Sequence, residues 1–255
     1  MHKTIQVAVM VLTVGLATGA CSAEADRSTA QERPTTSATI GGAPTQNPSV
    51  DAAVVRGSSE YDYPQTRSVS EAARKASSAL IGEVVGWSDG QTTVESDGAG
   101  YEDFSYNAVL AVKVQTARRN TAQRPGEIAY VTVYRGGELR IDGQPQGSEP
   151  AFASVEELSA AVPPGTRVIV LANPVPPASQ LQTDTPGAAV VSEAQGVPQG
   201  ATLIQPTPQG LLFQDETGGI DSGVADGESG WGWIPGNVPA PNSFAYLAAE
   251  VGRLR

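Results

Sequence analysis

Alternation of hydrophobic and polar residues predicts several β-strands in the middle of the chain. From Tyr106 to Val114 every second residue is apolar or aromatic, which is the pattern of a half-buried strand. Residues 166–172 are apolar at most positions and predict a central strand that is buried on both faces. Further strands are expected at residues 80–87, 128–134, 201–204 and 210–214, and the last two are expected to pair as a hairpin.

Three helices are expected beside these strands. Ser-x-x-Glu capping boxes at residues 68–71 and 154–157 begin two of them; the first continues to residue 79 and the second ends at residues 163–165, Pro-Pro-Gly. Residues 243–254 space their large apolar side chains at helical intervals. The fold expected is mainly β with short helices (α+β): a small OB-like antiparallel barrel or curled sheet with the C-terminal helix packed on it. An open α+β sandwich is the alternative.

The N-terminus has the organisation of a bacterial export signal. A short basic start precedes a mostly apolar run over residues 4–17, which has the length of a signal-peptide core and is short for a transmembrane helix. Leu16-Ala17-Thr18-Gly19-Ala20-Cys21 then resembles the lipobox of bacterial lipoproteins. The resemblance implies cleavage after residue 20, a diacylglycerol on the sulfur of Cys21, and attachment to the extracytoplasmic face of the cell membrane. An ordinary secretory signal or a transmembrane anchor is the alternative.

Composition divides the rest of the chain into two parts. Residues 21–67 are rich in Ser, Thr, Ala, Pro and Gly and show no sustained period, which predicts a disordered tether behind the lipidated cysteine. Residues 68–255 predict a single globular domain with a Pro-rich loop near residues 173–200. In its hydrophobic patterning, the part from 68 to 214 resembles a group of uncharacterised exported proteins of actinobacteria. That resemblance implies a fold and a location and carries over no functional residues.

Charge and rare residue types exclude several functions. The formal net charge is −11 and no basic run occurs, so we expect no nucleic-acid partner. The only histidine is His2 and the only cysteine is Cys21, so the body holds neither residue type. It therefore lacks the side chains for a Ser-His-Asp triad, a Cys-His pair or a His/Cys zinc site. Residues 86–90 match G-x-S-x-G, but without a later histidine they predict a hairpin turn.

Two groups of residues are candidates for ligand or metal binding. Trp87, Trp231 and Trp233 are candidates for a stacking platform for a sugar or peptide, although tryptophans also close the edge of a core. A Gly-rich stretch near the C-terminus is acidic and offers the oxygen ligands that Ca²⁺ prefers, although its spacing does not fit an EF-hand. The candidate metal ligands in it are Asp215, Asp221, Asp226 and Glu228. A solvated acidic loop is the alternative.

These observations predict a non-enzymatic binding or interaction module of the cell envelope. It is expected to be held at the membrane by its N-terminal lipid, to use no cofactor, and to bind an envelope protein or glycan. A hydrolase of envelope glycans that uses carboxylates alone is one alternative. A spacer lipoprotein without a specific ligand is the other.

Overall fold

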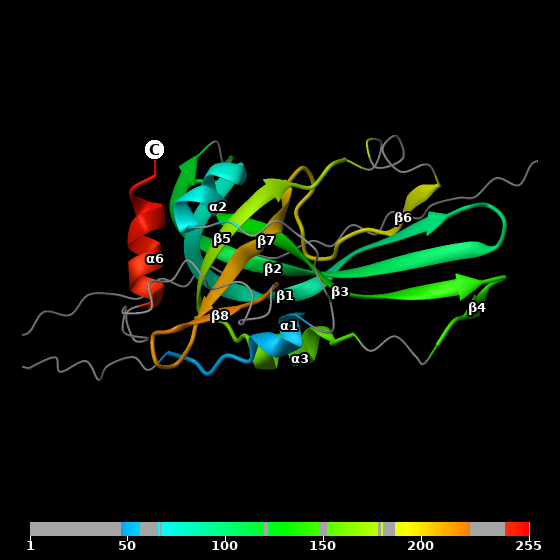
Figure 1. Ribbon diagram of the computed structural model, residues 1–255, viewed down its shortest axis with the longest axis horizontal. Coiled ribbons are helices and arrows are strands. Elements are labelled where there is room, and N and C mark those ends of the chain that lie inside the picture. The colour runs from blue at the N-terminus through cyan, green and yellow to red at the C-terminus, as the bar shows by residue number, and fades with distance from the viewer. Residues whose placement is uncertain are drawn as a thin grey trace, which may run out of the picture. The chain divides into compact units, whose positions relative to one another are not determined.

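Strands dominate the computed structural model, which describes residues 47–56, 66, 68–119, 122–147, 152–177, 180, 187–224 and 243–254. All of these residues belong to one compact unit, Pro44–Arg255. The strands are β1 (Ser78–Ser96), β2 (Tyr101–Arg119), β3 (Ile128–Ile141), β4 (Gln144–Pro145), β5 (Arg167–Pro174), β6 (Ala188–Ser192), β7 (Leu203–Gln214) and β8 (Ile220–Ser222). The helices are α1 (Ala52–Arg56), α2 (Val69–Lys75), α3 (Val155–Ala161) and α6 (Ser243–Gly252) (Figure 1).

Five of the strands close into a small barrel in the order β3, β2, β1, β5, β7. All neighbours are antiparallel except β7 and β3, which meet in parallel where Tyr130 lies opposite Leu203 and Val131 opposite Ile204. Helix α3 lies in the connection between β3 and β5, and α6 follows the last strand. This confirms the predicted mainly β, OB-like barrel with a C-terminal helix.

Two apolar clusters explain why the barrel forms: an inner cluster inside the barrel and an outer cluster between the barrel and helices α2 and α6. Strand β5 contributes to both, because Val168 and Val170 point into the barrel while Ile169 and Leu171 point outward under α2 and α6. Residues 168–172 are each 0 % exposed, which confirms the predicted central strand. The outer cluster is completed by α6, whose Phe244, Leu247 and Val251 are also 0 % exposed. Burial on this scale is the main favourable term in folding.

Helices α2 and α3 both begin at the predicted serine N-caps, and α3 has the complete capping box. In α3, Ser154 Oγ accepts from the Glu157 backbone N–H at 3.2 Å, and Glu157 Oε2 accepts from the Ser154 N–H at 2.7 Å. In α2, Ser68 Oγ accepts from the Glu71 N–H at 3.1 Å. The predicted extension of α2 to residue 79 is wrong, because the chain enters β1 at Ser78, two residues after the cap of α2.

Beyond the barrel, β1, β2 and β3 continue as a long extension that we call the arm. It comprises residues 92–106, residues 136–145 and β6, and Figure 1 shows β6 and β4 at its two sides. The predicted hairpin turn at residues 88–90 is therefore wrong: β1 runs on to Ser96, and the turn lies at residues 97–100. A register shift between Asp89 and Thr92 allows the turn-favouring residues 88–90 to lie within a continuous strand.

Two other predictions of connectivity need correction. Residues 201–204 and 210–214 do not form a hairpin, because β7 is one strand that pairs with β5 along most of its length and with β3 near its start. The predicted Pro-rich loop at 173–200 contains the end of β5 and the whole of β6. Strand β6 forms because Ala188, Ala189 and Val190 pair with the distal half of β1, a partner about a hundred residues earlier in the chain.

Part of the predicted tether, residues 47–56, is structured. Helix α1 places Ala52 and Val55 in the inner cluster with at most 1 % exposure. Strand β8 holds the start of this helix, because its Asp221 accepts a hydrogen bond from the Ala52 N–H at 3.3 Å. Across the described residues, no helix is both long and apolar enough to span a bilayer.

Candidate functional site

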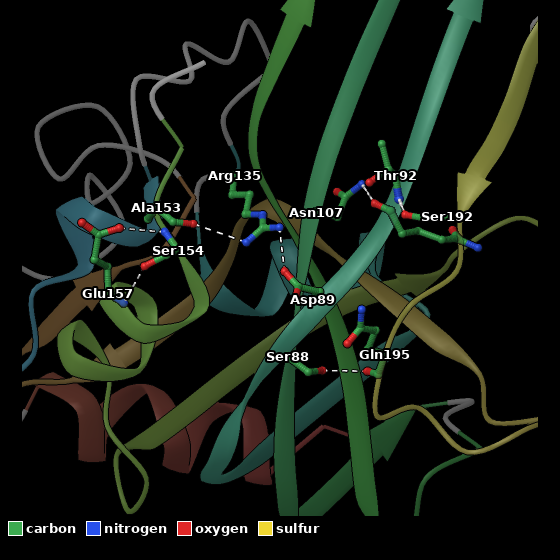
Figure 2. A network of polar contacts seen from close by, with 11 residues as sticks. Ser88, Asp89, Thr92, Asn107, Arg135, Ala153, Ser154, Glu157, Ser192 and Gln195 are labelled. Atoms are coloured by element: carbon green, nitrogen blue, oxygen red, sulfur yellow. Dashed lines mark hydrogen bonds and ion pairs between the residues drawn. The ribbon is translucent and has the colours of Figure 1, made fainter. Parts of the chain in front are cut away.

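The barrel changes into the arm at a row of strand irregularities that lie beside one another. In β1 the register against β2 shifts between Asp89 and Thr92, and in β3 Arg135 is the extra residue between Tyr134 and Gly136. Bulges of this kind bend a strand and redirect the side chain of the extra residue. At this junction the bulge directs Arg135 toward β1 and the chain before α3 (Figure 2).

Arg135 makes three different contacts at the junction. Its Nη2 lies 2.8 Å from Asp89 Oδ1, its Nη1 donates to the Ala153 carbonyl at 3.4 Å, and its guanidinium lies 5.0 Å from the ring centre of Phe152. The side chain is only 12 % exposed. Its Nε is buried and has no hydrogen-bond partner among the described residues. A buried donor without a partner costs free energy, so Arg135 is the least satisfied polar group of the junction.

Three further hydrogen bonds hold the arm and the β5–β7 connection in place, and Figure 2 shows them around β1. Asn107 Nδ2 donates to the Gln91 carbonyl at 2.9 Å, which joins β2 to the irregular part of β1. Ser88 Oγ donates to the Gln195 carbonyl at 2.8 Å. The Thr92 N–H donates to Ser192 Oγ at 3.2 Å. The middle serine of the G-x-S-x-G match thus binds a backbone carbonyl in the β5–β7 connection.

An aromatic row with an arginine at each end lies on β2, β3 and the segment before α3. We define the aromatic row as Phe104, Tyr106 and Phe152 with Arg140 and Arg135. Phe104 and Tyr106 are 6.4 Å apart between ring centres, and Tyr106 and Phe152 are 4.8 Å apart. The Arg140 guanidinium lies 4.5 Å from the centre of Phe104, and Arg135 contacts Phe152. All five side chains belong to half-buried residues.

Glu138 connects the middle of the row to one of its ends. It receives two hydrogen bonds from Arg140, at 2.7 and 2.9 Å, and a third from the Tyr106 hydroxyl at 2.8 Å. The hydrogen bonds from Arg140, followed by the one from Tyr106, hold the pKa of Glu138 below its usual range. Burial, reinforced by Glu138, raises the pKa of Tyr106. Glu138 is therefore a carboxylate and Tyr106 a neutral phenol at neutral pH.

Trp87, a predicted ligand residue, lies at the edge of the core. Its ring packs against the inner cluster, and its Nε1 donates to the Val162 carbonyl at 3.0 Å, just after α3. This is the core-edge position that the sequence left as the alternative. The indole N–H is thereby engaged within the protein, and Trp87 joins β1 to the end of α3.

The two described members of the predicted metal site serve different parts of the fold. Asp215 Oδ1 accepts from the Thr217 N–H, the Thr217 hydroxyl and the Gly219 N–H at 2.7–2.8 Å, which organises the turn between β7 and β8. Asp221 forms an ion pair with Arg56 at 3.1 Å and accepts from the first residue of α1. Within the described ranges, no group of three or more His, Cys, Asp or Glu side chains is arranged to hold a metal ion.

The remaining predicted residues lie outside the described part of the chain. They are Cys21, Trp231, Trp233, Asp226 and Glu228. The residues of the aromatic row were missed, because Tyr106 was assigned only to the apolar face of a strand. A signal was present: Phe104 and Tyr106 are two positions apart, as are Glu138 and Arg140, which is the spacing of one strand face.

Comparison of this chain with protein-family models, with curated protein sequences and with solved structures gives no match.

Proposed function

We propose that this protein is a non-enzymatic binding module of the cell envelope, whose ligand surface is the aromatic row. In this proposal a lipid on Cys21 holds it at the extracytoplasmic face of the membrane, as the lipobox-like sequence suggests. The observation that carries the binding function is the aromatic row itself. It gathers three aromatic rings and two arginines on one side of the β2–β3 pair, and the Glu138 carboxylate binds two of its members.

The place of the row in the fold supports this proposal. OB-like barrels bind oligonucleotides and oligosaccharides on the face of their second and third strands and on two flanking connections. Here those strands are β2 and β3, and the corresponding connections are the β1–β2 hairpin and the chain between β5 and β7. Strand β6, which belongs to the second of these connections, pairs with β1 at residues 92–95, just before the β1–β2 hairpin. The net charge of −11 disfavours a nucleic acid, which leaves a glycan as the ligand class that fits best.

The carboxylates support binding rather than hydrolysis. A glycosidase needs one carboxylic acid whose pKa is raised, so that it can protonate the leaving group. The pKa of Glu138 is lowered by Arg140 and Tyr106, and the pKa of Glu157 is lowered by the Ser154 backbone and hydroxyl of the capping box. Both groups are thereby stabilised in the charged form, which is the opposite of what a general acid requires.

The experiment is co-sedimentation of the full chain, purified in detergent, with insoluble cell-wall glycan. Tyr106→Ala should weaken binding about tenfold, because a stacking ring is lost from the centre of the surface. Tyr101→Ala is the matched control, since Tyr101 is on the same strand, faces the opposite side of the sheet and is 41 % exposed. Equal effects of the two variants would contradict the proposal. Retention of Cys21→Ala in the detergent phase of a two-phase partition would contradict the anchor.

A further inference from the structure

We propose that the aromatic row takes a pyranose ring that carries a carbonyl-type acceptor oxygen, and that this ring replaces Phe152 on Tyr106. The inference rests on the binding function proposed above and specifies its ligand. It follows from two features of the junction: Phe152 packs on the ring of Tyr106, and it provides no hydrogen-bond acceptor for the Nε–H of Arg135.

Phe152 covers two groups that a ligand would need. Its ring packs on Tyr106 with 4.8 Å between centres, and it lies 5.0 Å from the Arg135 guanidinium carbon. It belongs to neither strand of the row, since it lies two residues before the N-cap Ser154 of α3. Displacement of this one side chain would free the ring face of Tyr106 and the side of the Arg135 guanidinium that Phe152 contacts, without changing any strand pair.

Arg135 retains a donor that Phe152 does not satisfy. Nη2 is used by Asp89 and Nη1 by the Ala153 carbonyl, whereas Nε is buried and has no partner among the described residues. An aromatic ring contacts a guanidinium through its π-face and is no substitute for an acceptor oxygen. Phe152 therefore gives Tyr106 a favourable ring contact but leaves the Nε–H of Arg135 without an acceptor.

A ligand at this place needs an apolar face for the ring of Tyr106 and an acceptor oxygen for the Nε–H of Arg135. A substituted pyranose ring meets both requirements. The C–H face of a pyranose ring packs on an aromatic ring as another apolar surface does. An acetamido carbonyl or a carboxylate on the same ring supplies an acceptor for the Nε–H of Arg135, and a hydrogen bond to a charged donor is among the stronger ones. A sugar with hydroxyl groups alone meets the first requirement and only weakly the second. N-acetylated sugars and uronic acids share this chemistry.

The test measures the affinity of the full chain in detergent for three soluble tetrasaccharides by calorimetry. Chitotetraose carries acetamido groups, tetragalacturonate carries carboxylates, and maltotetraose carries neither. Phe152→Ala should bind chitotetraose or tetragalacturonate about tenfold more tightly than the wild type does, whereas maltotetraose, which gains only the packing on Tyr106, should show a much smaller gain. Phe152→Leu, which keeps apolar volume near α3, should show a smaller gain and serves if the alanine variant does not fold.

Arg135→Lys tests the acceptor contact, because lysine keeps a positive charge near Asp89 and removes the Nε–H along with the Nη1 contact to Ala153. In the background of Phe152→Ala, this substitution should abolish the gain. Wild-type binding with no gain in either Phe152 variant would overturn this inference and leave the binding function intact. An equal gain for maltotetraose would overturn the requirement for an acceptor oxygen. No binding of any tetrasaccharide by any variant would overturn this inference, and failure of the co-sedimentation as well would overturn the proposed function.

Discussion

The barrel and the arm share three strands, yet different forces hold them. In the barrel, β1, β2 and β3 contribute Leu80, Leu110 and Val131, which are 0 % exposed. In the arm, β2 and β3 carry half-buried aromatic and charged side chains that are held by a cation–π contact and hydrogen bonds. Apolar burial has no preferred direction, so it secures the barrel without defining a chemical surface. Directional contacts in the arm instead hold particular polar atoms in fixed positions.

The largest expected effect tests the barrel side of this comparison. Leu110→Ala should lower the free energy of unfolding by about 2–5 kcal/mol, because it leaves a cavity in the inner cluster. Ile141→Ala in the arm, where the side chain is 45 % exposed, should change it by no more than about 0.5 kcal/mol. Denaturant unfolding measures both. Similar losses in the two variants would show that the arm contributes to the same core.

An intermediate effect is expected at the junction. Arg135→Met keeps an unbranched side chain under Phe152 and removes the ion pair with Asp89 and the hydrogen bond to Ala153. We expect a loss of about 1–2 kcal/mol, because Asp89 keeps some contact with water and the buried Nε is removed as well.

The barrel and the arm are distinguished more clearly by where Arg135→Met destabilises the protein than by how much. Hydrogen exchange followed by mass spectrometry should be faster in residues 92–106 and in β6 of Arg135→Met, and unchanged in β5. Lys75→Met, which removes an exposed ion pair with Glu71 on α2, should leave the arm unchanged. Faster exchange throughout the barrel in Arg135→Met would refute a local role for the junction.

The smallest effect is a pH dependence confined to the arm. Hydrogen bonds from Arg140 and Tyr106 lower the pKa of Glu138 in the folded protein, so its stabilising contribution is present above the ordinary carboxyl pKa. That contribution is lost as the pH falls below about 4 and through the folded-state pKa. The difference in thermal stability between the wild type and Glu138→Gln should therefore be larger at neutral pH than at about pH 2. Glu95→Gln, at an exposed arm position, is the matched control and should not reproduce this trend.

Some elements could be predicted because their causes lie within a few residues. The capping box of α3 needs only Ser154 and Glu157, and the core face of α6 needs only the spacing of its own apolar residues. Residues 168–172 are all apolar, which is typical of a strand that is buried on both faces. The mainly β barrel with its C-terminal helix followed from these local signals.

The aromatic row could not be assembled in this way. Ser88-Asp89-Gly90 has the local chemistry of a turn, yet β1 continues through it because β2 pairs on both sides of the irregularity. Asp89 and Arg135 are 46 residues apart and meet only because their strands bulge at the same level. Phe152 reaches Tyr106 from a segment that is 46 positions further along the chain.

The amino-acid sequence alone thus determines where α2 and α3 begin, the core face of α6, the buried central strand, the acidic charge and the absence of histidine and cysteine from the body. Each of these depends on residue type or on spacing within one element. The tertiary structure determines where β1 ends, which strands close the barrel, and which rings and charges form one surface. Those features depend on register between strands far apart in the sequence, and register is set by the packing of whole strand faces rather than by any local signal.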